Sequence, residues 1–392
     1  MAALSDATLA AISRLSVGTP VTDASDFTAL TPAQVAAKYD LASYGGDGTL
    51  YALGSDGDYV ALDHDDPPVT DLGLWAVGGF VNVCPNGVMA GAVAGSPGTK
   101  PTGWWSIGGY QQSLDTTTLN GLPAIKITNN GTGQDYPWSA QNIALTAAQV
   151  FSYSAVAKSE VATSTLATYY YADGNNDYGG DISAAGLYKL ENQTRGVDGN
   201  AAFGFVRGIG DALTIAGQQV VIGAAVCPPV LALSSAATTT HLAAITQREV
   251  AVWKPFVVVI RARKQAPATG IYNSLYSLSR DGDNYFEIYA GPSGHVTIKM
   301  EVGGVISIQS LGPVTGSDFK VALNVTASYT RAVMTVGETQ TSFTLAAARF
   351  GGVATLESIG CAYNGGQQWS ELIQECTLIH PAVWTDAQLE AA

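Results

Sequence analysis

Short runs of alternating apolar and polar residues, separated by tight turns, fill the last third of the chain. Residues 256–263 begin as a solid apolar run and end in alternation. Similar runs rich in Val, Ile, Tyr and Phe cover residues 274–279, 285–289, 295–302 and 305–311, with Gly, Asp, Asn and Pro between them. Strands of this length and spacing predict an antiparallel β-sandwich.

A second strand-rich block, with more aromatic residues and glycine, precedes this one at residues 75–230. The strands expected in it are 122–127, 139–145, 151–157, 166–171, 202–206 and 220–226. The expected fold class is therefore mainly β, with two antiparallel β-sandwich (jelly-roll) domains at residues 75–230 and 231–392. A short helix capped by Thr385 is expected to end the chain.

Residues 1–74 have a different pattern, which predicts a small α+β anchor of short helices and a hairpin. Thr31-Pro32-Ala33-Gln34 has the capping-box spacing, and a hairpin is expected to turn at Asp56-Gly57. The prolines of residues 65–68 then indicate a stiff linker. Because the segment holds too few apolar residues for a core of its own, we expect it to dock on another protein.

Charge narrows the range of partners. The chain has a net charge of −14, which opposes binding to nucleic acid or to an anionic membrane. No apolar stretch approaches the roughly 20 residues needed for membrane insertion. The start at Met1–Asp6 lacks the basic residues of a secretory signal, so we expect synthesis in a host cytoplasm without export.

Only 13% of the residues are charged, against about 25% in a typical domain, so the surface must be largely neutral and polar. Surfaces of this kind are common on extracellular and particle-bound β proteins. A virion released by lysis reconciles such a surface with the missing export signal, and the virion is the expected location.

The four cysteines allow two interpretations. They are either buried free thiols or two pairs, Cys84 with Cys227 and Cys361 with Cys376. No C-x-x-C motif is present, so a zinc ribbon or a thioredoxin-like site is not indicated.

Two stretches resemble known families. Residues 250–392 look like a concanavalin-like lectin, or laminin-G-type, domain, on the strand series, the run 356–360 before Gly365-Gly366, and the ending at 379–389. The middle block is similar to the galactose-binding-like carbohydrate modules of phage fibres, on residues 86–104 and the strand pair 139–145 and 151–155. The resemblance implies a tail-fibre or head-spike protein of a phage or phage-like particle.

A sugar site requires exposed aromatic faces surrounded by groups that bond hydroxyls. Such residues occur in two stretches of the middle block and in one loop of the last. The candidate carbohydrate-binding residues are Tyr136, Trp138, Asp173, Asn175, Asp177, Tyr178, Asn364, Gln367 and Trp369. The alternative is that Trp138 and Trp369 belong to the core and that the polar loops are merely solvated.

No cofactor is expected, although residues 173–177 and 281–284 look like partial calcium loops, which also match ordinary Asp and Gly turns. No motif of a hydrolase is present in a suitable context, and no catalytic residue is expected. Glu371 and Glu375 are four positions apart rather than at alternate strand positions, so an enzyme is not predicted.

The expected function is host attachment by a virion fibre or spike that binds cell-surface polysaccharide. Residues 1–74 are expected to contact other virion proteins, and the assembly is expected to be a homo-oligomer, with a trimer favoured because multivalency strengthens weak sugar binding. The alternatives are a decoration protein that binds no sugar and a tailspike that degrades polysaccharide.

Overall fold

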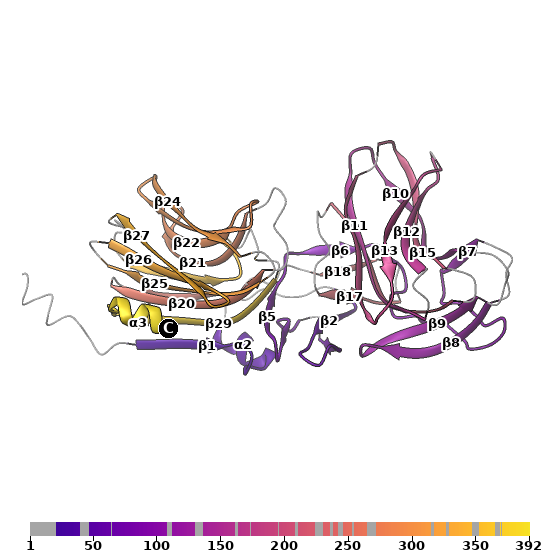
Figure 1. Ribbon diagram of the computed structural model, residues 1–392, viewed down its shortest axis with the longest axis horizontal. Coiled ribbons are helices and arrows are strands. Elements are labelled where there is room, and N and C mark those ends of the chain that lie inside the picture. Colours follow the sequence, from indigo (N-terminus) through magenta and orange to yellow (C-terminus); the bar gives the residue numbers. More distant parts are fainter. Residues whose placement is uncertain are drawn as a thin grey trace, which may run out of the picture. The chain divides into compact units, whose positions relative to one another are not determined.

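In the computed structural model, the chain is built almost entirely from antiparallel strands (Figure 1). The structure describes residues 21–392 except 40–46, 64, 108–111, 130–135, 161–163, 173, 195, 208–210, 224–229, 236–237, 242–245, 253–254, 265–271, 315–316, 327–328, 347–352, 365–368 and 370. The chain divides into unit 1, residues 1–42, 71–76 and 244–392, and unit 2, residues 43–70 and 77–243. Each unit contains stacked antiparallel sheets, so the predicted fold class of two β-sandwiches is confirmed.

Unit 1 consists of two sheets packed face to face (Figure 1). The first, named the β20 sheet, has the order β27 (Thr339–Ala346), β26 (Tyr329–Val336), β25 (Ser317–Val325), β20 (Phe256–Lys264), β29 (Glu371–His380), β5 (Gly73–Ala76). The second, the β22 sheet, has the order β19 (Thr246–Val252), β28 (Ala354–Ile359), β21 (Asn273–Asp281), β22 (Asn284–Ala290), β23 (His295–Val302), β24 (Val305–Pro313).

The core of unit 1 forms where alternate residues of the two sheets meet. The rings of Phe256 and Phe286 are 6.2 Å apart and nearly perpendicular. On the opposite face of the β20 sheet, Val257, Val259 and Ala322 are covered by helix α3 (Asp386–Ala391), whose Leu389 is buried. Thr385 caps this helix with Gln388 in a capping box, as the sequence predicts.

The division of the N-terminal segment differs from the predicted anchor at residues 1–74. Strand β1 (Val21–Asp26) pairs with residues 375–380 of β29, and β5 pairs with residues 371–373 of the same strand. Helix α2 (Pro32–Lys38), with the expected Thr31 capping box, also belongs to unit 1. The segment therefore completes a sandwich in unit 1, because the backbone groups of β29 need partners along this edge.

Charged and aromatic side chains hold this segment in unit 1. Arg248 forms ion pairs with Asp23 of β1 and with the buried Glu357 of β28, and its guanidinium lies 5.1 Å from the ring centroid of Tyr39. Tyr276 donates a hydrogen bond to the same Glu357 over 2.9 Å. A buried carboxylate requires partners of this kind, so the N-terminal segment is part of the internal polar network of unit 1.

Unit 2 has two main sheets. The β12 sheet has the order β13 (Asn176–Ile182), β12 (Ser164–Tyr170), β15 (Gly199–Val206), β10 (Tyr136–Leu145), β7 (Trp105–Ile107). The β16 sheet has the order β14 (Gly186–Thr194), β11 (Val150–Ser159), β16 (Ala212–Ile222), β6 (Phe80–Asn82), β18 (Thr239–His241), and β9 (Leu122–Asn129) joins β16 to β8 (Gln112–Leu119).

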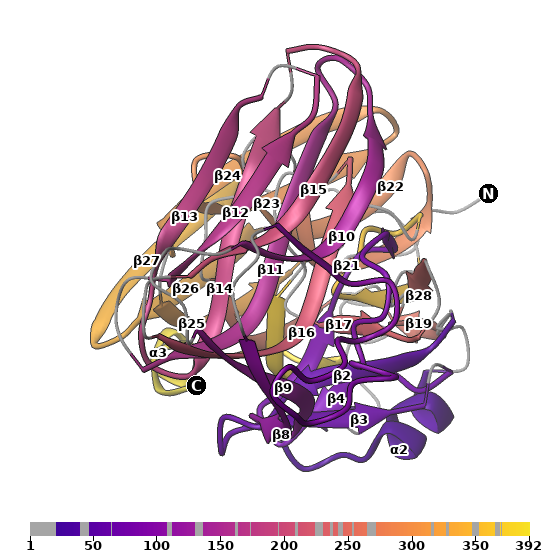
Figure 2. The ribbon, with the colours of Figure 1, turned by 90° about the vertical axis from the view of Figure 1, so that its right-hand side faces the viewer.

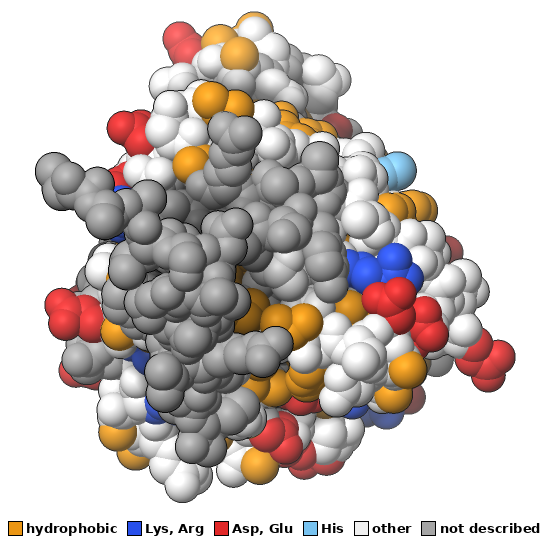
Figure 3. All heavy atoms as spheres, turned by 90° about the vertical axis from the view of Figure 1, so that its left-hand side faces the viewer, with side chains coloured by type: hydrophobic (Ala, Val, Ile, Leu, Met, Phe, Trp, Pro, Cys, Tyr) orange, Lys and Arg blue, Asp and Glu red, His pale blue; other side chains and the backbone are white. Residues whose placement is uncertain are grey.

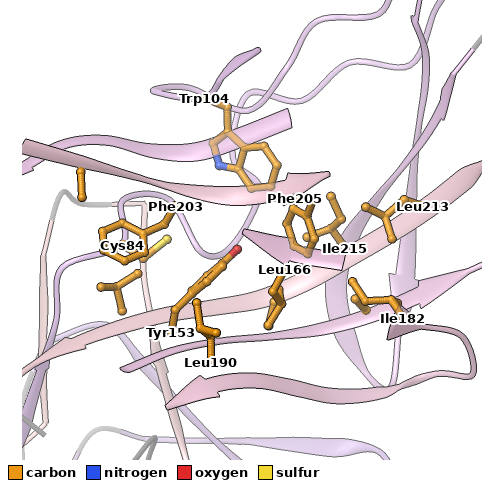
Figure 4. Packing of buried hydrophobic residues seen from close by; sticks show 14 of the residues in the cluster. Cys84, Trp104, Tyr153, Leu166, Ile182, Leu190, Phe203, Phe205, Leu213 and Ile215 are labelled. Carbon is orange, nitrogen blue, oxygen red and sulfur yellow. The ribbon is translucent and has the colours of Figure 1, made fainter. Parts of the chain in front are cut away.

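Aromatic rings fill the core between these two sheets (Figure 4). Phe203 of β15 packs edge-on against Phe151 and Tyr153 of β11, at centroid distances of 5.4 and 5.6 Å. The outer face of the β16 sheet packs on a third, small sheet, which comprises β17 (Leu231–Leu233), β2 (Thr49–Leu53) and β3 (Tyr59–Leu62). Strands β2 and β3 are the hairpin predicted at Asp56-Gly57, and β4 (Val69–Thr70) follows them.

Cys361 and Cys376 are buried free thiols, so their predicted pairing is wrong and the free-thiol interpretation holds for these two. Cys84 is buried as well. Cys227, the predicted partner of Cys84, lies outside the described residues. No helix in the described part of the chain is long and apolar enough to cross a membrane.

Candidate functional site

The outer face of the β12 sheet, which is turned away from the core of unit 2, carries exposed tyrosines. Figure 2 shows this sheet in front, with β13, β12, β15 and β10 side by side. Alternate residues of β12 and β15 point into the core, among them Leu166, Tyr170 and Phe203. The residues between them therefore point outward, because successive side chains of a strand alternate between faces.

Three tyrosines define this surface, which we call the tyrosine face: Tyr169 and Tyr171 at the end of β12, and Tyr178 on β13. Tyr171 and Tyr178 are 39% and 54% exposed, unusually high values for aromatic residues. The rings of Tyr169 and Tyr171 meet edge to face, with centroids 5.1 Å apart and planes at 82°. This contact fixes the direction in which the two rings present their surfaces.

Small residues lie between the aromatic positions. Ala167 is paired with Tyr178 on one side and with Gly204 on the other. Across the next two strands, the same row reaches Trp138 and then Trp105. Neighbouring strands lie about 4.8 Å apart, so the four spacings of this row span about 19 Å. Ala167 and Gly204 are thus small, buried residues between the aromatic positions of this row.

Exposed amide side chains lie at one end of the tyrosine face. Asn176 is paired with Tyr169, and Asn175 and Asn200 are exposed at the same end of the sheet. Tyr171 donates its backbone N–H to the carbonyl of Asn200 over 3.0 Å, which holds the end of β12 against β15. Amides offer both donors and acceptors, so they can bond the hydroxyl groups of a ligand lying on the rings.

The Tyr171 ring is neutral near physiological pH. Burial, together with the neighbouring Tyr169, raises the pKa of Tyr171 above its ordinary value. A neutral phenol offers both an apolar ring face and a hydroxyl that donates a hydrogen bond. The tyrosine face is therefore suited to a ligand with alternating apolar and hydroxyl-bearing surfaces.

Several predicted site residues of the middle block lie at this face. Tyr178 and Asn175 are exposed there, and Trp138 shares the row of Tyr178 although 40 positions separate them in sequence. The side chains of Tyr136 and Trp138 lie outside what the structure describes, as does Asp173. Asp177 accepts a hydrogen bond from the hydroxyl of the buried Tyr170. Its carboxylate therefore supports the turn rather than standing free for a ligand.

The predicted site in the last domain does not have the required exposed ring. Trp369 is fully buried, packs 5.8 Å from Phe319, and donates its indole N–H to the carbonyl of Arg263 over 3.2 Å. The expectation of an exposed Trp369 is wrong, because this large ring completes the core and finds its polar partner there. Asn364 is exposed, and Gln367 lies outside the described residues.

Residues 281–284, which look like a partial calcium loop in the sequence, form a turn held by local hydrogen bonds. The Asp281 carboxylate accepts hydrogen bonds from the backbone N–H of Asp283 over 3.0 Å and from the Asn284 amide over 2.7 Å. Such local bonds are the usual reason for aspartate in turns.

Asn200, Ala167 and Gly204 were not predicted from the sequence. Ala167 and Gly204 carry no recognisable motif, and their place in the row depends on which strands pair. The run Tyr169-Tyr170-Tyr171 was the available signal for the two rings, because alternation places its first and third residues on one face.

No protein-family model and no curated protein sequence matches the chain. Among solved structures, it is similar to the CBM40 domain of the Ruminococcus gnavus IT-sialidase bound to α2,6-sialyllactose, with 18% identity and a TM-score of 0.29 over 36% of this chain and 83% of that one. A tailspike protein from Escherichia coli O157:H7 bacteriophage CAB120 has 12% identity and a TM-score of 0.29, over 36% of this chain and 21% of that one.

A heptameric SAP-like pentraxin from Limulus polyphemus has 13% identity and a TM-score of 0.27, over 36% of this chain and 70% of that one. At these identities and TM-scores, neither the ligands nor the assemblies of those proteins transfer to this chain.

Proposed function

We propose that this chain is a carbohydrate-binding attachment protein, and that the tyrosine face of unit 2 holds the sugar. The observation that carries the proposal is the pair of exposed rings, Tyr171 and Tyr178, on the outer face of the β12 sheet beside exposed asparagines. Sugar rings have an apolar face that stacks on aromatic side chains and hydroxyls at their edges that need polar partners.

The row across the sheet favours a chain of sugars over a single ring. The row of paired residues from Tyr178 to Trp105 spans about 19 Å, which is longer than one sugar. Each stack contributes about 1 kcal/mol, so single contacts are weak. A polysaccharide that contacts several positions at once gains affinity from their sum, which fits a cell-surface polymer.

We further propose that the chain belongs to a fibre or spike of a phage or phage-like particle. Its support is the resemblance of residues 86–104 and 379–389 to phage tail proteins and the low share of charged residues, 13%. Mass spectrometry of purified particles tests this assignment: peptides of this chain should copurify with particles through a density gradient. A chain found only in the soluble lysate would contradict it.

The binding proposal is tested on a printed panel of neutral and acidic polysaccharides. Tyr171→Ala and Tyr178→Ala should each weaken binding about fivefold, since about 1 kcal/mol is lost with each ring. The thermal midpoint should stay within a degree or two, because both rings are exposed. Val383→Ala in unit 1, where the side chain is 56% exposed and belongs to neither proposed site, is the matched control and should leave binding unchanged.

Two results would replace the proposal. If the wild-type chain binds no polysaccharide in the panel, a decoration protein without sugar affinity becomes the better description. If bound polysaccharide is shortened, with release of new reducing ends, the chain is a degrading tailspike. We expect binding without release.

A further inference from the structure

A second polar surface lies on unit 1, on the face of the β22 sheet that is turned away from its core. Glu287 of β22 is paired with Ser277 of β21 and with Lys299 of β23. Directly opposite residues of antiparallel strands share a face, so these three side chains form one row. The core residues Phe286 and Ile288 flank Glu287 in sequence and point to the other face.

Glu287 is buried without a full set of partners. Glu287 is only 5% exposed, and its Oε1 atom accepts no hydrogen bond from any residue that the structure describes. The Ser277 hydroxyl beside it is fully buried and likewise has no partner among the described residues. Buried polar atoms are nearly always bonded, because leaving one unbonded costs about 1–3 kcal/mol.

Burial raises the pKa of Glu287, although the Ser274 hydroxyl and the charge of Lys299 favour the ionised form. A carboxyl group in this position is costly to the fold. Functional sites commonly retain groups that destabilise the protein when no ligand is present.

Two tyrosine residues of β22 flank Glu287. Tyr285 and Tyr289 are two positions before and after Glu287, on the same face of β22. Each has a second ring against it: Tyr363 stacks on Tyr285 with centroids 4.6 Å apart, and Tyr272 meets Tyr289 edge to face at 5.4 Å. The carboxylate thus lies between two tyrosine pairs.

The charge of Lys299 limits which ligands can bind beside Glu287. Its ammonium lies 3.2 Å from the Glu301 carboxylate, 4.8 Å from the centroid of the Tyr285 ring, and donates to the Tyr285 hydroxyl. The cation-binding surface of that ring is therefore already used, and a second cation would be repelled. The carboxylates of Glu287 and Glu301 would likewise repel an anionic ligand. An uncharged ligand that brings its own hydroxyl groups is favoured.

We propose that Glu287 and Ser277, between the pairs Tyr285–Tyr363 and Tyr272–Tyr289, form a second saccharide-binding site, specific for uncharged sugars. Sugar hydroxyls donate to Oε1 of Glu287 and bond the Ser277 hydroxyl, while the ring of Tyr272 stacks on the sugar. Tyr272 is 51% exposed, so its ring is accessible to a ligand. This inference rests on the proposed function, since it gives the chain a second contact with the same class of polymer.

The site is tested on a panel of printed oligosaccharides with the full chain, in a Tyr171→Ala/Tyr178→Ala background that removes the tyrosine face. This background should retain binding to a subset of neutral oligosaccharides. Adding Glu287→Gln or Ser277→Ala should weaken that binding at least tenfold. Glu249→Gln is the matched control, because Glu249 is exposed on β19 of the same sheet, and it should change nothing.

The thermal midpoint separates a ligand site from a structural role. Glu287→Gln should leave it equal or higher, because a buried amide costs less than a buried carboxylate. A lower midpoint with unchanged binding would mean that Glu287 serves the fold only.

If the background binds no oligosaccharide while the wild-type chain does, the second site is rejected and the tyrosine face stands alone. If the background binds but Glu287→Gln and Ser277→Ala bind equally well, the second site is also rejected. If the wild-type chain binds none of the panel, both proposals fail.

Discussion

At the scale of single residues, two aromatic residues in similar sequence contexts have opposite environments in the structure. Trp369 and Tyr178 both follow polar loops rich in amides and acids, yet Trp369 is fully buried and Tyr178 is 54% exposed. The difference lies in the strand register, which places Tyr178 on the outer face of an edge strand, paired with Ala167. Composition around an aromatic residue therefore indicates a binding loop only when the face of its strand is known.

The burial of Trp369 gives a first prediction. Trp369→Ala should lower the free energy of unfolding of unit 1 by about 3–5 kcal/mol, because a large buried ring is removed. Trp369→Phe should cost less, since it keeps most of the contact with Phe319 and loses the bond to the Arg263 carbonyl. Denaturation followed by intrinsic fluorescence measures both. Equal stability of wild type and Trp369→Ala would contradict the packing described here.

A second prediction concerns the pH dependence of Asp23. Burial opposes ionisation of Asp23, but its contacts with Lys38 and Arg248 outweigh burial and lower its pKa below the ordinary value. A lowered folded-state pKa contributes stability above the ordinary aspartate value of about 4, and this contribution is lost as the pH falls through the folded-state pKa.

Asp23→Asn should therefore be less stable than wild type at pH 7, and the difference should shrink as the pH falls below about 4. Urea denaturation at a series of pH values measures it. Asp283→Asn, in an exposed turn, is the control and should match wild type throughout. A difference that grows on acidification would show that the ion pairs of Asp23 do not stabilise the fold.

At the scale of elements, local signals succeeded and distant pairings did not. The capping boxes at Thr31 and Thr385 and the turn at Asp56-Gly57 are read from three or four adjacent residues, and all appear in the structure. The pairing of β1 with β29 joins residues 24 and 377. No local pattern encodes such a pairing, because it depends on which edge of the folded sheet lacks a partner.

The candidate site follows the same rule. The aromatic residues of the middle block were visible in the sequence, but the row of Tyr178, Gly204 and Trp138 required the pairing of four strands. The alternation Tyr285, Glu287, Tyr289 was also visible. The alternation indicates a binding site only if the Glu287 carboxylate is buried, and the sequence pattern does not predict that burial.

The position of β1 leads to a third prediction, at the scale of elements. Deleting residues 1–38 should destabilise unit 1, because it exposes the edge of β29 and removes the buried side chains of Phe27 and Val35. The buried side chains alone account for about 3–6 kcal/mol. Since a domain has only about 5–15 kcal/mol to lose, the truncated chain should melt in two steps, with unit 1 first.

Deleting residues 1–20 is the control for this experiment. It retains β1 and every described contact of the segment, so calorimetry should show the wild-type transition. If removal of residues 1–38 leaves calorimetry unchanged, the N-terminal segment acts as the separable anchor expected from the sequence.

At the scale of the whole molecule, the net charge and the number of linked binding sites determine how strongly the protein binds a ligand. In the view of Figure 3, acidic side chains are scattered among uncharged polar ones, and the most prominent group of basic side chains lies beside acidic ones. With a net charge of −14, the protein has little means of attracting polyanions. Binding through aromatic rings and amides should therefore persist at high salt, unlike binding through phosphate contacts.

A fourth prediction concerns the assembly. We expect a homotrimer of about three times 40.5 kDa, because joining several weak sugar sites raises affinity by about 10²–10⁴-fold. Mass photometry of the purified chain measures the mass. Glycan binding by the same sample at low and high surface density measures the gain from multivalency. A monomer that binds equally well at both densities would contradict the prediction.

The interleaving of the two units has a consequence for synthesis on the ribosome. Unit 2 is complete once residue 243 has emerged, whereas β1 must wait for β29, which begins at Glu371, about 345 residues after β1 ends at Asp26. At about 5–20 residues per second, this delay lasts on the order of 17–70 s. During that time a strand with no partner is attached to a nascent chain whose second unit can already fold. The yield of this protein should therefore depend on translation speed and on chaperones that cover the N-terminus until the last strand arrives.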